Sequence, residues 1–134
     1  MDKDRIVLLI DDDEDDMELL HETLRDINHD FHIIQASDGK SGLKILDELV
    51  INNTLPCLVV LDLNMPGIDG RQAFMKMKNN DDLTNVPVVI FSTSSSELDK
   101  SFFTKYNTPY FVKPVSLEEL NKTAKKMLSL CNED

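Results

Sequence analysis

Acidic side chains follow the first apolar segment of the chain in an unbroken run. The sequence LLIDDDEDDMELL (residues 8–20) places six acids directly after Ile10. Like charges this close repel one another, so a folded chain needs a cation or a helix dipole to hold them together. We expect Asp11 and Asp12, which end the apolar segment, to belong to a functional site. The next four acids (residues 13–16) are predicted to stabilise the start of a helix.

Further polar residues follow other apolar segments. Asp62 follows CLVVL, Ser92 and Thr93 follow VVIF, and Lys113 with Pro114 follows YFV. In an open parallel sheet, ligands bind at the carboxyl ends of the strands, near the point where the strand order reverses. If the apolar segments are neighbouring strands, their ends bring carboxylates, a hydroxyl and an ammonium group to one place.

This set of side chains suits a divalent cation and a phosphoryl group. Magnesium takes oxygen ligands at roughly 2.0–2.1 Å, and three carboxylates around one small space supply them. Asp62 opens DLNMPGIDG (residues 62–70), whose proline and glycines predict a tight loop that can turn the backbone carbonyl of Asn64 toward the cation. A phosphoryl group on Asp62 would add up to about two negative charges. Magnesium, Lys113 and a hydroxyl from the Ser92 region could offset them.

Five short apolar segments predict the β-strands that position these residues. The first, third and fourth segments are apolar without alternation, which is typical of strands buried on both faces of a parallel sheet. Helical patterns alternate with the strands along nearly the whole chain. We therefore expect one α/β domain, a parallel sheet with helices on both faces. The predicted strands are residues 5–10, 31–36, 57–61, 88–91 and 110–112.

The helices are predicted from apolar residues that recur at three- and four-residue steps. The last helix opens with a Ser-x-x-Glu capping box at residues 116–119. In the fourth helix, Leu98, Phe102 and Phe103 are expected to face the core. Residues 94–96 are expected to cap its start. The other apolar faces are expected at Met17, Leu20, Leu24 and Ile27, at Leu43, Leu46, Leu49 and Val50, and at Ala73, Phe74 and Met77.

Composition and charge exclude several classes of protein. The chain has 134 residues, 41% of them hydrophobic and 29% charged, as in an ordinary globular domain. Its formal net charge of -11 would repel phosphate backbones, so we expect no direct binding of nucleic acid. No apolar run approaches the roughly 18 residues of a membrane helix, and the N-terminus lacks a signal-peptide core, so we expect no membrane insertion and a cytoplasmic location. Cys57 and Cys131 have no metal-ligand spacing and are predicted to have no framework role.

Four motifs together resemble the receiver domain of two-component response regulators. LLIDDDE, VVLDLNMPGIDG, VVIFST and YFVKP occur in the order and spacing of that family, over about residues 5–130. The resemblance implies a flavodoxin-like fold, with five parallel strands in the order 2-1-3-4-5. It also implies a stand-alone, chemotaxis-regulator-like receiver domain at residues 1–134 with no output domain.

The resemblance assigns roles around the acids. Asp62 would be the phosphoacceptor, which takes a phosphoryl group from a histidine kinase or phosphotransfer protein. Asp12 would bind Mg²⁺ directly, Asp11 would act mainly through bound water, and Asn64 would offer its backbone carbonyl.

It also assigns the residues that respond to phosphorylation. Ser92 would be the switch hydroxyl, Lys113 the partner of the phosphate, and Tyr110 the aromatic residue that changes rotamer. Receivers catalyse their own phosphorylation and dephosphorylation but are signalling switches rather than enzymes. A downstream protein target is therefore expected as a partner, with a homodimer as a further possibility.

Three other function classes share part of the pattern. Haloacid-dehalogenase-like phosphatases also use a strand-end aspartate with magnesium, but they need a second acid where this chain has Asn64. Flavodoxin-like cofactor binders need Ser, Thr and Gly donors in the first loop, whereas an acidic loop repels phosphate. Receivers that do not depend on phosphorylation usually lack one of the acids or the lysine, and all of these are present.

Overall fold

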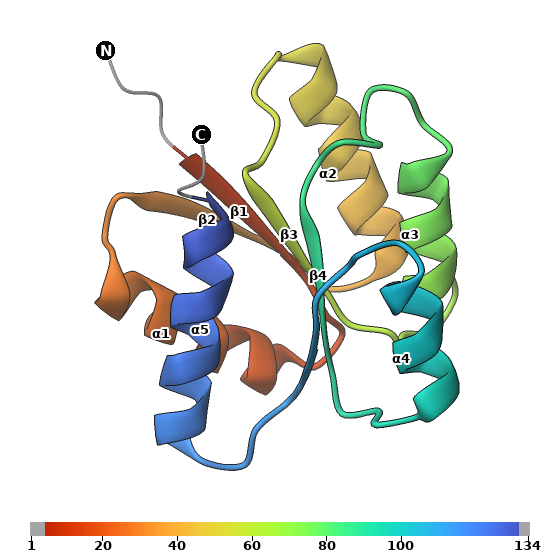
Figure 1. Cartoon of the computed structure of the whole chain (residues 1–134). Coiled ribbons are helices and arrows are strands. Elements are labelled where there is room, and N and C mark those ends of the chain that lie inside the picture. The colour runs from red at the N-terminus through yellow and green to blue at the C-terminus, as the bar shows by residue number, and fades with distance from the viewer. Residues whose placement is uncertain (1–4, 132–134) are drawn as a thin grey trace.

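Parallel strands form the centre of the molecule, and helices cover both faces of the sheet. The computed structural model describes residues 5–131. Within them, five strands and five helices alternate along the chain, as the sequence predicted (Figure 1). The strands are β1 (Arg5–Ile10), β2 (Phe31–Ala36), β3 (Leu58–Leu61), β4 (Val88–Ser92) and β5 (Tyr110–Val112). The helices are α1 (Glu14–Ile27), α2 (Gly39–Ile51), α3 (Gly70–Lys78), α4 (Glu97–Thr104) and α5 (Leu117–Cys131).

The strand order is β2-β1-β3-β4-β5, and every neighbouring pair is parallel, so the predicted fold class is confirmed. Because the chain passes from β2 on one side of β1 to β3 on the other, the order reverses between β1 and β3. Ile10 pairs with Leu61 there. The residues that follow them, Asp11 and Asp62, therefore leave the sheet side by side.

The pairing of β4 with β5 brings the carboxyl ends of these two strands to the same end of the sheet as Asp11 and Asp62. Ser92 pairs with Val112, and the backbone N–H of Lys113 donates to the Ser92 carbonyl at 2.8 Å. Since all five strands run the same way, Ser92 and Lys113 emerge at the end of the sheet that carries Asp62.

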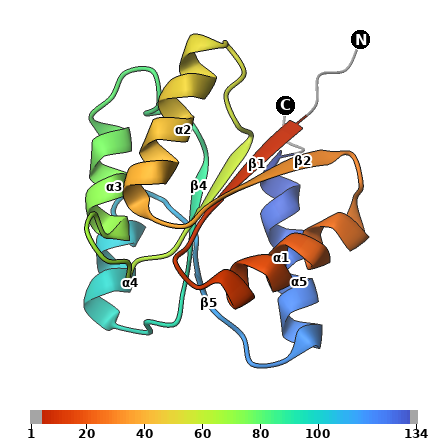
Figure 2. The same ribbon diagram turned by 180° about the vertical axis from the view of Figure 1, so that it is seen from behind.

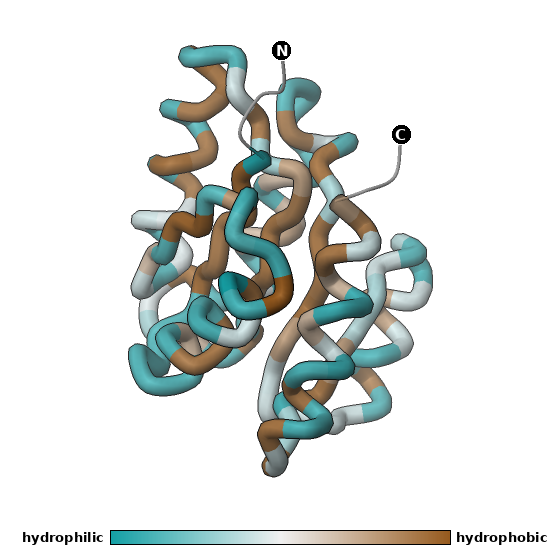
Figure 3. The backbone as a smooth tube through the Cα atoms, turned by 90° about the vertical axis from the view of Figure 1, so that its left-hand side faces the viewer, coloured by the Kyte–Doolittle hydropathy of each residue, from teal (hydrophilic) through white to brown (hydrophobic). Residues whose placement is uncertain are grey.

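Helices α1 and α5 lie on one face of the sheet, and α2, α3 and α4 lie on the other (Figures 1 and 2). A hydrophobic core lies on each face of the sheet, and alternating residues of β1 contribute to the two cores. Val7 and Leu9 pack with α1 and α5, whereas Leu8 and Ile10 pack on the opposite face. Apolar residues accordingly follow the central strands, and hydrophilic residues the loops (Figure 3). Across residues 5–131, no helix is long and apolar enough to cross a membrane.

Aromatic rings hold α4 against α3. The Phe74 ring of α3 lies 5.0 Å from the Phe103 ring and 5.2 Å from the Tyr106 ring, both edge-on. Edge-on pairs at this spacing add to the stabilisation that burial alone provides. The prediction for Leu98 was wrong, since 84% of it is exposed. The inward face of α4 is instead centred on Asp99 and Phe103, which are both buried.

Short polar side chains cap the helices. Asp13 accepts from Asp16 N–H at the start of α1, and Asp69 forms a capping box with Gln72 at the start of α3. The cap of α4 is Ser96, within the predicted residues 94–96. At α5, the Ser116 hydroxyl accepts from the backbone N–H of Glu119 at 3.1 Å, which is one of the two hydrogen bonds of the predicted capping box.

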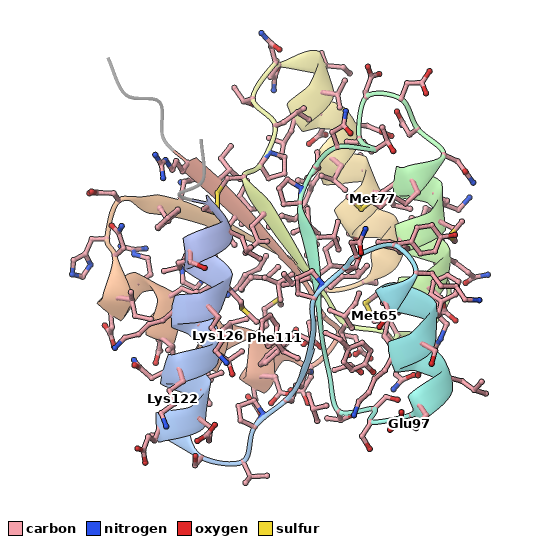
Figure 4. All side chains as sticks on the ribbon, in the orientation of Figure 1. Met65, Met77, Glu97, Phe111, Lys122 and Lys126 are labelled. Carbon is pink, nitrogen blue, oxygen red and sulfur yellow. A yellow bond between two sulfur atoms is a disulfide. The ribbon has the colours of Figure 1, made fainter. Side chains whose placement is uncertain are left out.

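The prediction that the cysteines have no framework role was wrong. Cys57 and Cys131 form a disulfide with a Cα–Cα distance of 5.0 Å, which joins the residue before β3 to the end of α5. Figure 4 shows the sulfur–sulfur bond at the upper end of α5. The sequence separation of 74 residues explains the error, because the sheet and not the spacing brings the two residues together.

Candidate functional site

Three carboxylates gather at the carboxyl ends of β1 and β3. Among the described residues, oxygen atoms of Asp11, Asp12 and Asp62 all lie within 4.8 Å of one another. Opposite ligands of an octahedral magnesium ion stand about 4.2 Å apart, so these donors fit a small divalent cation. Asp11 and Asp62 are buried and Asp12 is exposed, which leaves one side of the cluster open to solvent.

The loop after β3 fixes one oxygen of Asp62. The backbone N–H of Leu63 donates to Asp62 Oδ1 at 2.9 Å, and Gly70 N–H closes the loop on the Leu63 carbonyl at 2.9 Å. A Cβ atom at Gly70 would collide with the Asp62 carbonyl, so the loop needs glycine there. Asn64, the predicted carbonyl ligand, is an exposed residue of this loop.

Lys113 is the cation that the structure places among these acids. Its Nζ lies 2.7 Å from Asp11 Oδ2 and 2.9 Å from Asp16 Oδ2. The same atom lies 3.8 Å from Asp62 Oδ2. Since 8% of the lysine side chain is exposed, its contacts with the buried Asp11 and Asp62 are shielded from solvent, whereas Asp16 is partly exposed. The free oxygen of Asp62 thus faces an ammonium group.

Burial and ion pairing shift the pKa values of Asp11 and Lys113. Burial raises the pKa of Asp11 to about 6, although hydrogen bonds from Lys113 and from the backbone of Asp13 oppose the shift. Burial alone would lower the pKa of Lys113, but its hydrogen bonds to Asp11 and Asp16 outweigh that effect and raise the pKa to about 12. The lysine therefore stays charged, and a cation near Asp11 would favour the ionised carboxyl group.

Asp16 is the site residue that the sequence reasoning missed. It was assigned with its neighbours to the helix start alone, yet it reaches Lys113 from the first turn of α1. Asp12 precedes α1, so no helical spacing marked Asp16, and its partner Lys113 is 97 residues away in the sequence. Glu14 and Asp15 lie in that first turn as predicted, and both are exposed.

Ser92 and Thr93 differ in their surroundings. Ser92 ends β4 and is fully buried, whereas Thr93 is exposed. The Ser92 hydroxyl oxygen accepts from Ser94 N–H at 3.2 Å. Ser92 is therefore buried beside the Lys113 backbone, and its role as the switch hydroxyl stays a prediction.

The Tyr110 hydroxyl is directed at the loop after β4 and not at the acids. It donates to the Ser94 carbonyl at 2.8 Å, and its ring centroid lies 6.1 Å from that of Phe103. The predicted site residues therefore form two neighbouring groups. The acids and Lys113 make one group, and Ser92 and Tyr110 meet the Ser94 region in the other.

Comparison with known proteins shows the family of the chain. A family model described as the response regulator receiver domain matches residues 7–125. The response regulator Rcp1 of Synechocystis sp. is 32% identical over 121 residues, which are 88% of this chain and 82% of that protein.

Two solved structures are also similar. That of the phosphorylated cyanobacterial phytochrome response regulator RcpA has a TM-score of 0.84 at 28% identity and covers 95% of this chain and 96% of its own. That of the Mn²⁺-bound form of Rcp1 has a TM-score of 0.82 at 31% identity, and the match covers 93% of this chain and 92% of that one.

Proposed function

This chain belongs to the response regulator receiver domain family of two-component signalling, and we propose that it accepts a phosphoryl group on Asp62. The donor is the phosphohistidine of a sensor kinase or of a phosphotransfer protein. A carboxylate oxygen of Asp62 attacks phosphorus while the phosphorus–nitrogen bond breaks. The product is an acyl phosphate on Asp62, and the electrons of the broken bond stay with the imidazole.

The observation that carries this proposal is the position of Asp62 beside Asp11, Asp12 and Lys113. Leu63 N–H holds one oxygen of Asp62, and the other oxygen faces the Lys113 ammonium at 3.8 Å. A phosphoryl group on that oxygen would bring its negative charge toward Lys113. Charge stabilisation of this kind accounts for most of the catalysis of phosphoryl transfer.

The donor set also supports a magnesium cofactor. Asp11, Asp12 and Asp62 would hold the ion with the backbone carbonyl of Asn64, and their oxygens are spaced for such a ligand shell. When bound, magnesium would neutralise charge on the phosphoryl oxygens. The Mn²⁺-bound and phosphorylated states named for two similar structures support both parts of the proposal.

The output of this domain is a change in protein binding. In our proposal the domain is a cytoplasmic signalling switch rather than an enzyme, and its core is the receiver domain matched at residues 7–125. Ser92, Lys113 and Tyr110 pass the state of Asp62 to the surface around β5 and α5. That surface exposes Val115 and Leu117, which suits a protein target or a second copy of the chain.

Mass measurement after incubation with acetyl phosphate and magnesium tests the proposal. We expect the protein to gain one phosphoryl group and the Asp62→Asn variant to gain none. Asp47→Asn is the matched control, because Asp47 is an exposed acid of α2. A phosphoryl group on the Asp62→Asn variant would overturn the assignment.

A further inference from the structure

A network of hydrogen bonds outside the acid cluster ties α3 to α4. Arg71, the second residue of α3, donates from Nε to Asp99 Oδ1 at 2.8 Å and from Nη2 to Asp99 Oδ2 at 2.7 Å. Two parallel N–H···O bonds to one carboxylate are strong and fix the orientation of both groups.

The Asp99 carboxylate has a further partner in the loop after β4. The hydroxyl of Ser94 donates to Asp99 Oδ2 at 2.9 Å, and Asp99 itself is buried. The Arg71 hydrogen bonds, with a smaller contribution from Ser94, lower the pKa of Asp99, so the carboxylate is ionised at neutral pH. The ion pair therefore anchors Ser94 to two helices.

Ser94 in turn contacts Ser92 and Tyr110, two of the residues that were predicted to respond to phosphorylation. Its backbone N–H donates to the Ser92 hydroxyl oxygen at 3.2 Å, and its carbonyl accepts from the Tyr110 hydroxyl at 2.8 Å. The side chain of Ser94 thus binds Asp99 while its backbone binds Ser92 and Tyr110. A shift of Ser94 would disturb the Ser92 and Tyr110 contacts at once.

The Ser94 N–H also determines what the Ser92 hydroxyl can do. Because the oxygen accepts this hydrogen bond, the hydroxyl's own hydrogen can be donated to another group. Ser92 lies at the end of the sheet that carries Lys113 and Asp62. A phosphoryl oxygen on Asp62 is therefore a suitable acceptor for the hydrogen of the Ser92 hydroxyl.

We propose that Arg71 and Asp99 are positioning residues that hold Ser94, and through it the Ser92 hydroxyl and the Tyr110 ring, ready for the phosphoryl group. The inference rests on the proposed function of Asp62 and adds the residues that tune its response. If the loop after β4 is already ordered, less conformational entropy is lost when Ser92 contacts the phosphoryl group. The network therefore raises the affinity of the site for a phosphoryl group or its mimic.

The network can be broken without loss of the helix that it anchors. The aromatic rings of α3 and α4 hold these helices together independently of Arg71 and Asp99. Arg71→Gln and Ser94→Ala should therefore fold. Glu97→Gln is the matched control, because Glu97 is an exposed acid in the same turn of α4 as Asp99; Figure 4 shows it at the start of that helix.

The experiment titrates each protein with beryllofluoride, a phosphoryl mimic, at saturating magnesium. Tyrosine ring NMR signals report the response, and a Tyr106→Phe variant assigns the Tyr110 signal. Arg71→Gln and Ser94→Ala should each raise the half-saturating concentration about fivefold. The magnesium concentration for half-saturation should not change. Both residues act through Asp99. The Arg71→Gln/Ser94→Ala double variant should therefore have a half-saturating concentration no higher than that of the single variant that binds beryllofluoride less tightly.

The outcomes separate this inference from the proposed function. Absence of any saturable response in the unmodified protein would overturn both. A normal response there, with half-saturation unchanged in Arg71→Gln and Ser94→Ala, would overturn the positioning role alone. So would a lower melting temperature of these variants without any change in beryllofluoride affinity. Recovery of affinity in Arg71→Lys, which keeps the charge, would support the role.

Discussion

The ammonium group of Lys113 lies 2.9 Å from the Asp16 carboxylate, nearer than its 3.8 Å distance from Asp62. An acid in the first turn of α1 therefore shares the lysine with the acids at the strand ends. The Asp16 side chain is 39% exposed, so solvent weakens its attraction for Lys113. Asp16 thus competes modestly with Asp62, and with any group added to it, for one cation.

Removal of this competition should favour the phosphorylated state. In Asp16→Asn, Lys113 loses a charged partner and can approach Asp62 more freely. We expect beryllofluoride, titrated with magnesium, to reach half-saturation at a concentration about threefold lower. Asp15→Asn, a change at the exposed neighbouring acid, should leave the titration unaltered. Weaker binding in Asp16→Asn would mean that Asp16 supports Lys113 and does not compete for it.

Ser92 and Thr93 should differ in their effect on signalling. Ser92→Ala removes a buried hydroxyl beside Lys113, so it should leave phosphorylation of Asp62 largely intact and abolish the response of the surface around Tyr110. Thr93→Ala changes an exposed side chain and should be milder. Hydrogen exchange between residues 92 and 113, with and without beryllofluoride, measures the response. The reverse pattern would shift the switch hydroxyl to Thr93.

Magnesium should stabilise the fold by relieving repulsion within the acid cluster. Binding to the folded state alone raises stability by mass action. Asp12→Asn removes one of the like charges, so we expect the metal-free variant to melt about 2 °C higher and the shift caused by magnesium to shrink. Asp47→Asn serves as the control. An undiminished magnesium shift in Asp12→Asn would place the ion elsewhere.

Reduction of the disulfide should weaken the fold but not the site. The bond closes a loop with a sequence separation of 74 residues, which corresponds to roughly 4 kcal/mol of unfolding free energy by loop-closure entropy. Urea unfolding with and without dithiothreitol measures the difference, and a Cys57→Ser/Cys131→Ser double variant should not respond to the reductant. Phosphorylation of Asp62 should persist in reduced protein, because Cys57 lies at the opposite end of β3. Equal stability of both forms would show that the bond does not stabilise the fold.

The Arg71–Asp99 pair should make stability depend on pH. Hydrogen bonds from Arg71, helped by Ser94, lower the pKa of Asp99 below its ordinary value of 3.8. A lowered pKa contributes stability above the unfolded-state value that is lost as pH falls through the folded-state value. Asp99→Asn should therefore be less stable than the unmodified protein at pH 7, and the gap should close below about pH 4. A gap that is constant from pH 7 to pH 3 would contradict the ionic origin of the effect.

Much of the fold could be predicted because buried parallel strands leave a simple pattern. Leu58–Leu61 and Val88–Ser92 are buried throughout, and unbroken apolar runs marked both to within one residue. The rule that ligands bind at the carboxyl ends of strands then brought Asp11, Asp62 and Lys113 together, as the structure does.

The remaining features depend on contacts that no local pattern records. Leu98 was expected in the core because apolar side chains favour burial, yet Asp99 takes the inward position since Arg71 of α3 compensates its charge. Cys57 and Cys131 meet because β3 and α5 pack together. In each case, the partner lies far away in the sequence.

The strand order also has a consequence for folding. Each parallel pairing is reached through a helical crossover, so the end of β1 meets the ends of β3 and β5 only after long loops have closed. Only a fragment that spans residues 11–113 contains Asp11, Asp62 and Lys113 together. Ligand binding at these residues therefore depends on the packing of three strands that are far apart in the sequence. A molecule in which these strands have not come together lacks the site.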